Sequence, residues 1–157
     1  MQDAAVDAEP ATELERVYRE HGARLWRALL AFTGDREVAS DALAEAFAQA
    51  LGRGAALRSP LHWVWKAAFR IARGELRARG RPPSELERSY EASDPDPEVM
   101  QALARLPRGQ RAAVVLHHVA DYPVREVARI LGSTPAAVRM QLTRGRRRLR
   151  HLLEGSR

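Results

Sequence analysis

Aromatic and basic side chains alternate in one segment near the middle of the 157-residue chain. An aromatic ring can stack on an unpaired base while a neighbouring cation contacts the phosphates, and each stacked base contributes about 1–3 kcal/mol. The segment is therefore a candidate surface for single-stranded nucleic acid. Its candidate residues are Trp63, Trp65, Lys66, Phe69, Arg70, Arg73 and Arg77. The alternative is that the rings anchor an alanine-rich core. One helical stripe cannot bury all three rings equally, so we expect at least one near the surface.

Arginine is concentrated again near the end of the chain, with five arginines between positions 144 and 150. No acidic residue lies nearby before Glu154, so local ion pairs cannot neutralise them. Such a row suits phosphate contacts, whose affinity falls steeply with salt. The alternative is a solvated helix end, because positive charge also suits the carboxyl end of a helix dipole.

The residues before this row predict a helix-turn-helix. Apolar residues recur every three or four positions across 124–131, which indicates a short amphipathic helix. Gly132 supplies the turn, Ser133 or Thr134 caps the next helix, and Pro135 suits its first position. A helix, a short turn containing glycine and a second helix form a motif that reads the major groove. The candidate DNA contacts on the second helix and its cap are Thr134, Ala136, Ala137, Arg139, Met140, Thr143, Arg144, Arg147 and Arg148.

A third set of candidates is acidic. Asp35, Glu37, Asp41 and Glu45 lie away from the apolar stripe of a predicted helix, and Asp35 is a suitable N-cap. They could be catalytic carboxylates, but we favour a helix side that faces solvent or a partner.

Several kinds of chemistry are excluded. The chain has no cysteine, which removes disulfides, thiol catalysis and thiolate metal sites. Adjacent His117 and His118 point about 100° apart on a helix and cannot chelate one metal together. The sequence has no phosphate-binding loop and no nucleophile motif. We therefore expect no enzyme activity, no metal, no cofactor and no catalytic residue. No apolar run reaches the roughly 18 residues of a membrane span, and the acidic N-terminus does not resemble a secretory signal.

Charge divides the chain into alternating blocks. Residues 1–52 carry a net charge of −5, residues 53–80 carry +6, residues 81–99 carry −4 and residues 100–157 carry +9. Basic blocks attract polyanions, whereas acidic blocks keep away from them.

The elements that position these residues are predicted to be helices. Periodic apolar residues indicate helices over 13–32, from Asp35 to about 51, over about 61–79, over 97–106 and over 108–119. The stretch between 80 and 97 has four prolines and no sustained apolar period, as expected of a linker. We therefore expect an all-α fold with two small helical domains, 12–80 and 98–154, joined by a proline-rich acidic linker, 81–97.

With these features assembled, the chain resembles an extracytoplasmic-function (ECF) sigma factor of bacterial RNA polymerase over nearly its whole length. The resemblance rests on five segments. They are 34–39 and Ala46–Phe47 in the acidic helix, 63–77 in the aromatic helix, Leu106–Arg111 before the helix-turn-helix, and 126–150 within it.

The resemblance implies a mechanism and partners. The first domain would bind core RNA polymerase through Asp35, Glu37, Asp41, Glu45 and Phe47. The aromatic helix would melt the −10 element and hold the melted strand. The second domain, a helix-turn-helix of the winged-helix-like, sigma region 4 type, would read the −35 element as duplex. An anti-sigma factor is a possible partner, and the location implied is cytoplasmic.

Two alternatives stay open. A stand-alone helix-turn-helix regulator would bind duplex DNA by itself, but it has no use for an exposed helix of tryptophan and arginine. A sigma-like decoy would bind polymerase or an anti-sigma partner without initiating transcription, which the alanines at 44, 46, 136 and 137 would allow.

Overall fold

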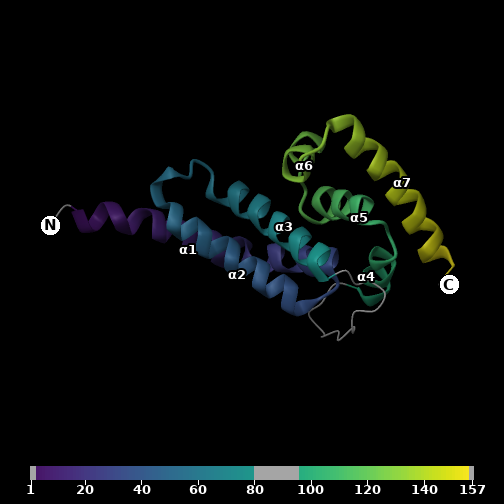
Figure 1. The fold of residues 1–157 in the computed structure, drawn as a ribbon, viewed down its shortest axis with the longest axis horizontal. Coiled ribbons are helices and arrows are strands. Elements are labelled where there is room, and N and C mark those ends of the chain that lie inside the picture. The colour runs from purple at the N-terminus through teal and green to yellow at the C-terminus, as the bar shows by residue number, and fades with distance from the viewer. Residues whose placement is uncertain (1–2, 80–95, 156–157) are drawn as a thin grey trace.

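The computed structural model describes residues 3–79 and 96–155, and its regular structure in these ranges is entirely helical (Figure 1). The all-helical prediction is confirmed. The first helical group comprises α1 (Asp3–Thr33), α2 (Arg36–Arg53), the 3-10 turn η1 (Gly54–Ala56) and α3 (Pro60–Arg79). The second helical group comprises α4 (Pro97–Ala104), α5 (Arg108–Val114), the π-helical turn η3 (Val115–Val119), α6 (Val124–Leu131) and α7 (Pro135–Glu154).

One helix begins earlier than the sequence predicts. Helix α1 begins at Asp3 rather than at residue 13, because the intervening alanine-rich stretch favours helix. Pro97, which the sequence placed both at the end of the linker and at the start of the helix over 97–106, is the first residue of α4, and the Asp96 carboxylate caps that helix by accepting from the Glu98 N–H at 2.9 Å. The rest of the predicted linker, up to residue 95, lies outside the described residues.

Alanines let the first three helices approach closely. Ala39, Ala42 and Ala46 of α2 and Ala68 and Ala72 of α3 are completely buried. Small side chains at these positions leave room for the larger ones that fill the core. These are Leu25, Leu29, Phe32, Val38, Val64 and Phe69.

Local signals determine the helix-turn-helix as predicted. Gly132 ends α6 with φ +64°, in the left-handed region that glycine tolerates best. The Thr134 hydroxyl caps α7 by accepting from the Ala137 N–H at 3.2 Å, and Pro135 is the first helical residue. At Gly145, α7 passes so close to α5 that a Cβ would lie 2.9 Å from the Val114 Cγ2 atom.

The two helical groups pack against each other. Helix α1 contacts α4, α5 and η3, and α3 contacts α6. Helix α7 lies on the outer side of the second group, where it packs on α4, α5 and α6 (Figure 1). The face of α3 toward the second group is therefore covered, whereas the outer face of α7 is not.

Candidate nucleic-acid interface

The first turns of α7 present small and flexible side chains to solvent. Ala136, Ala137 and Arg139 are exposed, and Met140 retains 54% of its surface. The buried face of the helix, Val138 and Leu142, fixes this orientation. A helix of this shape, with small residues at its start, can enter the major groove and bring side chains to base edges.

Two hydroxyls of this face are engaged by the helix itself. Thr134 serves as the N-cap, and the Thr143 hydroxyl donates to the Arg139 carbonyl at 2.9 Å. Both side chains are exposed. Their local hydrogen bonds hold the backbone and the cap in a fixed shape.

The arginine row continues along the same helix. Arg144, Arg147 and Arg148 are exposed, as are their neighbours Arg146 and Arg150. Among the residues whose side chains the structure describes, no carboxylate forms an ion pair with any of them. Five unneutralised guanidinium groups on one exposed helix create a positive surface suited to phosphates.

The aromatic and basic residues predicted to form one surface lie on different faces of α3. Lys66 and Arg70 are exposed, and the half-buried Trp63 ring lies 5.2 Å below the Arg53 guanidinium. These residues form the outer face of α3. The expectation of at least one ring near the surface holds for Trp63.

Trp65 and Phe69 do not lie on that surface. Phe69 is completely buried against Phe32, with ring centroids 5.4 Å apart, and Trp65, 3% exposed, stacks on Phe69 at 6.1 Å. Tyr122 of the second group closes over Trp65, edge to face at 5.4 Å. The placement of these two rings at the DNA surface was wrong for this arrangement, because α3 is covered on two sides and buries more than one stripe.

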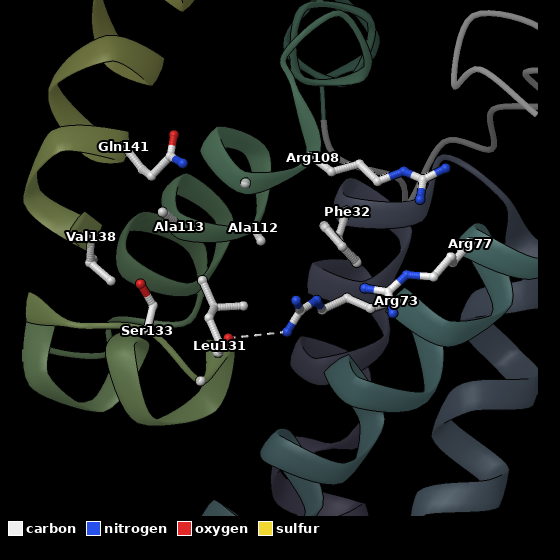
Figure 2. A pocket seen from close by; sticks show the side chains of 12 residues that line it. Phe32, Arg73, Arg77, Arg108, Ala112, Ala113, Leu131, Ser133, Val138 and Gln141 are labelled. Carbon is white, nitrogen blue, oxygen red and sulfur yellow. Dashed lines mark hydrogen bonds between the residues drawn. The ribbon is translucent and has the colours of Figure 1, made fainter. Parts of the chain in front are cut away.

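The two remaining basic candidates of α3, Arg73 and Arg77, face the second group. Arg73 donates to the Leu131 carbonyl at the end of α6, at 3.3 Å, and Arg77 lines the same space (Figure 2). Arg77 is exposed and Arg73 is half-buried. Access to Arg73 depends on how closely the two groups are packed.

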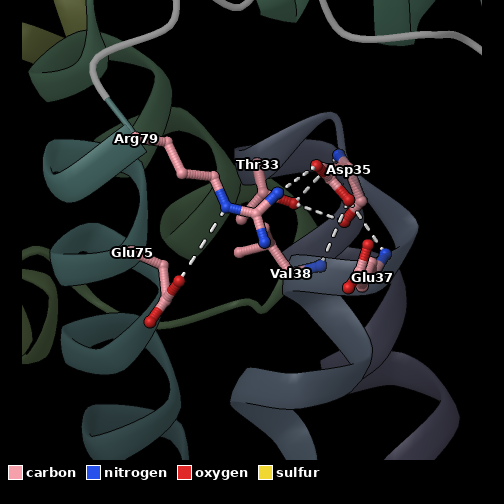
Figure 3. A network of polar contacts seen from close by, with 6 residues as sticks. All are labelled: Thr33, Asp35, Glu37, Val38, Glu75 and Arg79. Atoms are coloured by element: carbon pink, nitrogen blue, oxygen red, sulfur yellow. Dashed lines mark hydrogen bonds and ion pairs between the residues drawn. The ribbon is translucent and has the colours of Figure 1, made fainter.

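The acidic helix divides into a capping residue and an exposed face. The Asp35 carboxylate accepts from the backbone N–H groups of Glu37 at 2.9 Å and Val38 at 3.2 Å, which confirms it as the N-cap of α2. It also pairs with Arg79 of α3 at 3.2 Å (Figure 3). Asp35 therefore fastens α2 to α3. Glu37, Asp41 and Glu45 are exposed.

Sequence reasoning missed an apolar groove beside this acidic face. It has a volume of about 610 Å³, and it runs between α1 and α2 with Tyr18 and Trp26 on one side and Leu43 and Ala44 on the other. Tyr18 is 56% exposed, since it lies at the edge of the apolar stripe of α1 and packs edge-on against the half-buried Phe47. The spacing of aromatic residues at 18 and 26, two turns apart, could have revealed it.

Polar contacts cross between the two groups. Arg111 of α5 is 1% exposed and donates to the Phe32 carbonyl at 2.7 Å and to the Leu106 carbonyl at 3.1 Å. Burial, and secondarily the charge of Arg108, lowers the pKa of Arg111 to about 10. Arg24 also forms an ion pair with Asp121 across the groups, and the His62 Nε2 atom lies 2.9 Å from a carboxylate oxygen of Glu126.

Known proteins share these features. The family model "Sigma-70, region 4" matches residues 97–149. The ECF RNA polymerase sigma factor SigM of Mycobacterium tuberculosis is 30% identical over 149 residues, which cover 88% of this chain and 76% of SigM. The ECF RNA polymerase sigma factor SigE of Mycolicibacterium smegmatis is 28% identical over 96% of this chain and 65% of SigE.

A solved structure shares the fold. The sigma factor RpoE from Bartonella quintana, crystallised with the anti-sigma factor NepR, superposes with a TM-score of 0.74. The superposition covers 94% of this chain and 98% of RpoE at 19% identity. Within the part of the chain that the structure describes, no helix combines the length and apolar character needed to cross a membrane.

Proposed function

The chain belongs to the ECF sigma factors of RNA polymerase, and on this premise we propose how its surfaces divide the recognition of a promoter. The chain binds core RNA polymerase and directs the initiation of DNA-templated transcription as its promoter-specificity subunit. In our proposal residues 12–80 dock on the core enzyme and open the −10 element, residues 98–154 bind the −35 element, and residues 81–97 link them.

Helix α7 is the proposed −35 reader. Ala136, Ala137, Arg139 and Met140 would approach base edges, while Arg144, Arg147 and Arg148 would hold phosphates. Thr134, the N-cap, and Thr143, exposed on the same helix, complete the proposed contact surface. The single observation that carries the proposal is the exposed arginine row, which lacks any neutralising carboxylate among the described residues and follows directly on a well-capped helix-turn-helix. Charges left unpaired on one helix favour a polyanionic partner.

The outer face of α3 is the proposed contact for the melted strand. Trp63 would stack on an unpaired base, and Lys66 and Arg70 would follow the phosphates. Arg73 and Arg77 would join them when the second group moves away from α3. Opening a duplex requires only binding energy that favours the unpaired state, so no catalytic group is needed.

The proposed docking surface for core polymerase combines the acidic face of α2 with the neighbouring groove. Glu37, Asp41 and Glu45 supply negative charge, and the groove beside Tyr18 and Phe47 supplies apolar surface. Asp35 contributes by fixing the start of α2. Apolar surface ringed by charge is typical of protein interfaces.

Further aspects of the proposal follow from the family. The chain would act without enzymatic activity of its own, and it would work in the cytoplasm, where core polymerase and promoters meet. An anti-sigma factor is a proposed partner, since the structurally similar RpoE was crystallised with one.

Run-off transcription tests the proposal. Purified chain and core polymerase, incubated with a library of genomic fragments, should yield transcripts from a small set of promoters, whereas core polymerase alone should not. Arg139→Ala should alter which fragments are used. Arg105→Ala, which removes an exposed arginine at the end of α4 and leaves the arginine row of α7 intact, is the matched control.

The outcome also separates the alternatives. A stand-alone regulator would bind specific duplexes tightly without polymerase, whereas we expect the isolated chain to bind them poorly. A sigma-like decoy would bind core polymerase and give no transcripts from any fragment.

A further inference from the structure

We propose that the cavity between α3 and the helix-turn-helix is a binding site for a small phosphate-bearing anion, which holds the two helical groups together. The inference deepens the proposed function, since α3 carries the proposed strand contacts. It assigns a ligand class to the space that Arg73 and Arg77 line while the two groups are packed together.

The cavity is bordered by both helical groups. It has a volume of about 360 Å³, and its lining includes Arg73 and Arg77 from α3, Arg108 from α5, Ser133 from the turn and Gln141 from α7 (Figure 2). No aspartate or glutamate is among the described residues that line it. The volume falls at the lower end of the range for small-molecule pockets, which suits an anion up to about the size of a mononucleotide.

Donors remain available at its wall. Arg73 and Arg108 each donate to one backbone carbonyl, Leu131 at 3.3 Å and Leu76 at 3.2 Å. A guanidinium has five N–H groups, so each has several left. Among residues 3–79 and 96–155 the Arg77 guanidinium makes no polar contact, and the side chains of Ser133 and Gln141 make no hydrogen bond. Guanidinium groups bind phosphate oxygens in paired, charge-assisted hydrogen bonds.

The charge balance at this junction favours an anion. Arg73 and Arg77 of α3 line the same cavity as Arg108 of α5, whose guanidinium donates to the Leu76 carbonyl of α3, and Arg111 lies buried one turn further along α5. The charge of Arg108 contributes to the lowered pKa of Arg111. The positive potential at the cavity wall therefore reaches the interior of the second group. A dianion between these side chains would remove the repulsion and leave each guanidinium with a partner.

A ligand bound here would act on the arrangement of the molecule. Because both groups supply the guanidinium groups, the complete site exists only while the groups are packed together. A ligand that binds one state alone stabilises it in proportion to its concentration. The packed state buries Trp65 under Tyr122 and engages Arg73, so the bound anion would keep this part of α3 from DNA.

Calorimetric titration of the full chain with inorganic phosphate, at constant ionic strength in chloride, tests binding directly. We expect saturable binding of one phosphate per chain. Arg77→Gln removes a guanidinium without breaking any described contact and should weaken binding at least about tenfold, the effect of losing a charged hydrogen bond. Arg105→Gln, a matched loss of exposed charge outside the cavity, should leave the affinity unchanged. No saturable binding, or equal affinity in Arg77→Gln, would overturn the proposal.

A second measurement follows the packing of the two helical groups against each other. The chain has no cysteine, so Ala48→Cys on α2 and Glu154→Cys on α7, both exposed, can carry a donor and an acceptor dye. Phosphate at 100 times its Kd should increase about 100-fold the ratio of chains whose two helical groups are packed together to chains whose groups are apart. The same titration is repeated with ATP and with adenosine, which distinguishes a nucleotide ligand from free phosphate. Tighter binding of ATP than of phosphate indicates a nucleotide ligand, and binding of adenosine alone contradicts an anion site.

The test is independent of the proposed function. Absence of phosphate binding in a chain that supports run-off transcription removes the anion site and leaves the promoter mechanism intact. Phosphate binding in a chain that yields no transcripts supports the site and removes its link to promoter opening.

Discussion

The Arg111 guanidinium of α5 donates a 2.7 Å hydrogen bond to the carbonyl of Phe32, at the end of α1 and 79 positions earlier in the chain. Its second hydrogen bond, to the Leu106 carbonyl at 3.1 Å, stays within the second group. One buried cation thus satisfies a carbonyl near the end of α1 and a carbonyl in the turn between α4 and α5, and no carboxylate accompanies it in the described residues. Arg111 is the buried member of the set of polar contacts that join the two groups.

Replacing Arg111 should therefore loosen both groups. Arg111→Ala leaves two carbonyls without their donor and should lower the free energy of unfolding by about 1–3 kcal/mol. Arg111→Met, which keeps most of the volume, should lower it less, because part of the loss comes from packing. Urea denaturation measures both, with Arg105→Ala expected within about 0.5 kcal/mol of the parent. Equal stability of Arg111→Ala and the parent would show that the buried contact contributes nothing.

Two helical glycines should respond in opposite directions to alanine. At Gly145 a new Cβ would lie 2.9 Å from Val114, so Gly145→Ala should destabilise the chain by about 1–3 kcal/mol. At Gly74, in α3, nothing lies within 4 Å of the new Cβ, and Gly74→Ala should stabilise by up to about 1 kcal/mol through helix propensity. Thermal denaturation of the pair checks this. Stabilisation by both substitutions would mean that α5 and α7 are not closely packed.

Substitutions of the two tryptophans of α3 should have different effects, one on stability and the other on promoter opening. Trp65→Ala removes a buried ring that contacts Phe69 and Tyr122, and should lower the free energy of unfolding by about 3–5 kcal/mol. Trp63→Ala, at the half-buried ring, should have a much smaller effect on stability but slow promoter opening more than it weakens the closed complex. Denaturation and potassium permanganate footprinting measure the two effects. Equal losses in opening and in closed-complex binding would make Trp63 a structural residue.

The helix-turn-helix could be predicted from sequence because its signals are local. The apolar period over 124–131, a glycine with positive φ at 132 and a capping threonine at 134 lie within a dozen residues of one another. Each signal acts through its own backbone turn. The capping role of Asp35 was predictable for the same reason.

The aromatic part of the site could not be predicted in the same way. Whether Trp65 is exposed depends on Tyr122, which comes 57 positions later, and on the packing of α3 against α6. Periodicity describes one face of one helix, whereas α3 is covered from two sides. The placement of Arg73 against Leu131 likewise follows from contacts between the two helical groups.

The second group should become less stable in mild acid. Burial, then the charges of His117 and Arg146, lower the pKa of His118, while Asp121 opposes them. Since the folded state resists protonation, the unfolded chain binds more protons, and stability should fall as the pH drops below about 6.5. Arg146→Gln should raise the pKa of His118, and Arg150→Gln should not. NMR titration of the imidazole protons distinguishes the two, and an unshifted pKa in Arg146→Gln would contradict the electrostatic cause.

The arginine row of α7 should produce the salt dependence of promoter binding. If the exposed Arg147 contacts a phosphate, Arg147→Ala should weaken binding to all sequences alike and reduce the slope of log affinity against log salt by about one. Holoenzyme affinities for cognate and scrambled duplexes, measured across a series of salt concentrations, give both quantities, and Arg105→Ala should leave the slope unchanged. The salt slope depends on the charge at the phosphate, which lysine keeps, so Arg147→Lys should retain most of the slope. A loss confined to one base pair of the −35 element would instead identify Arg147 as a base-reading residue, because only a contact to a base edge distinguishes sequences directly.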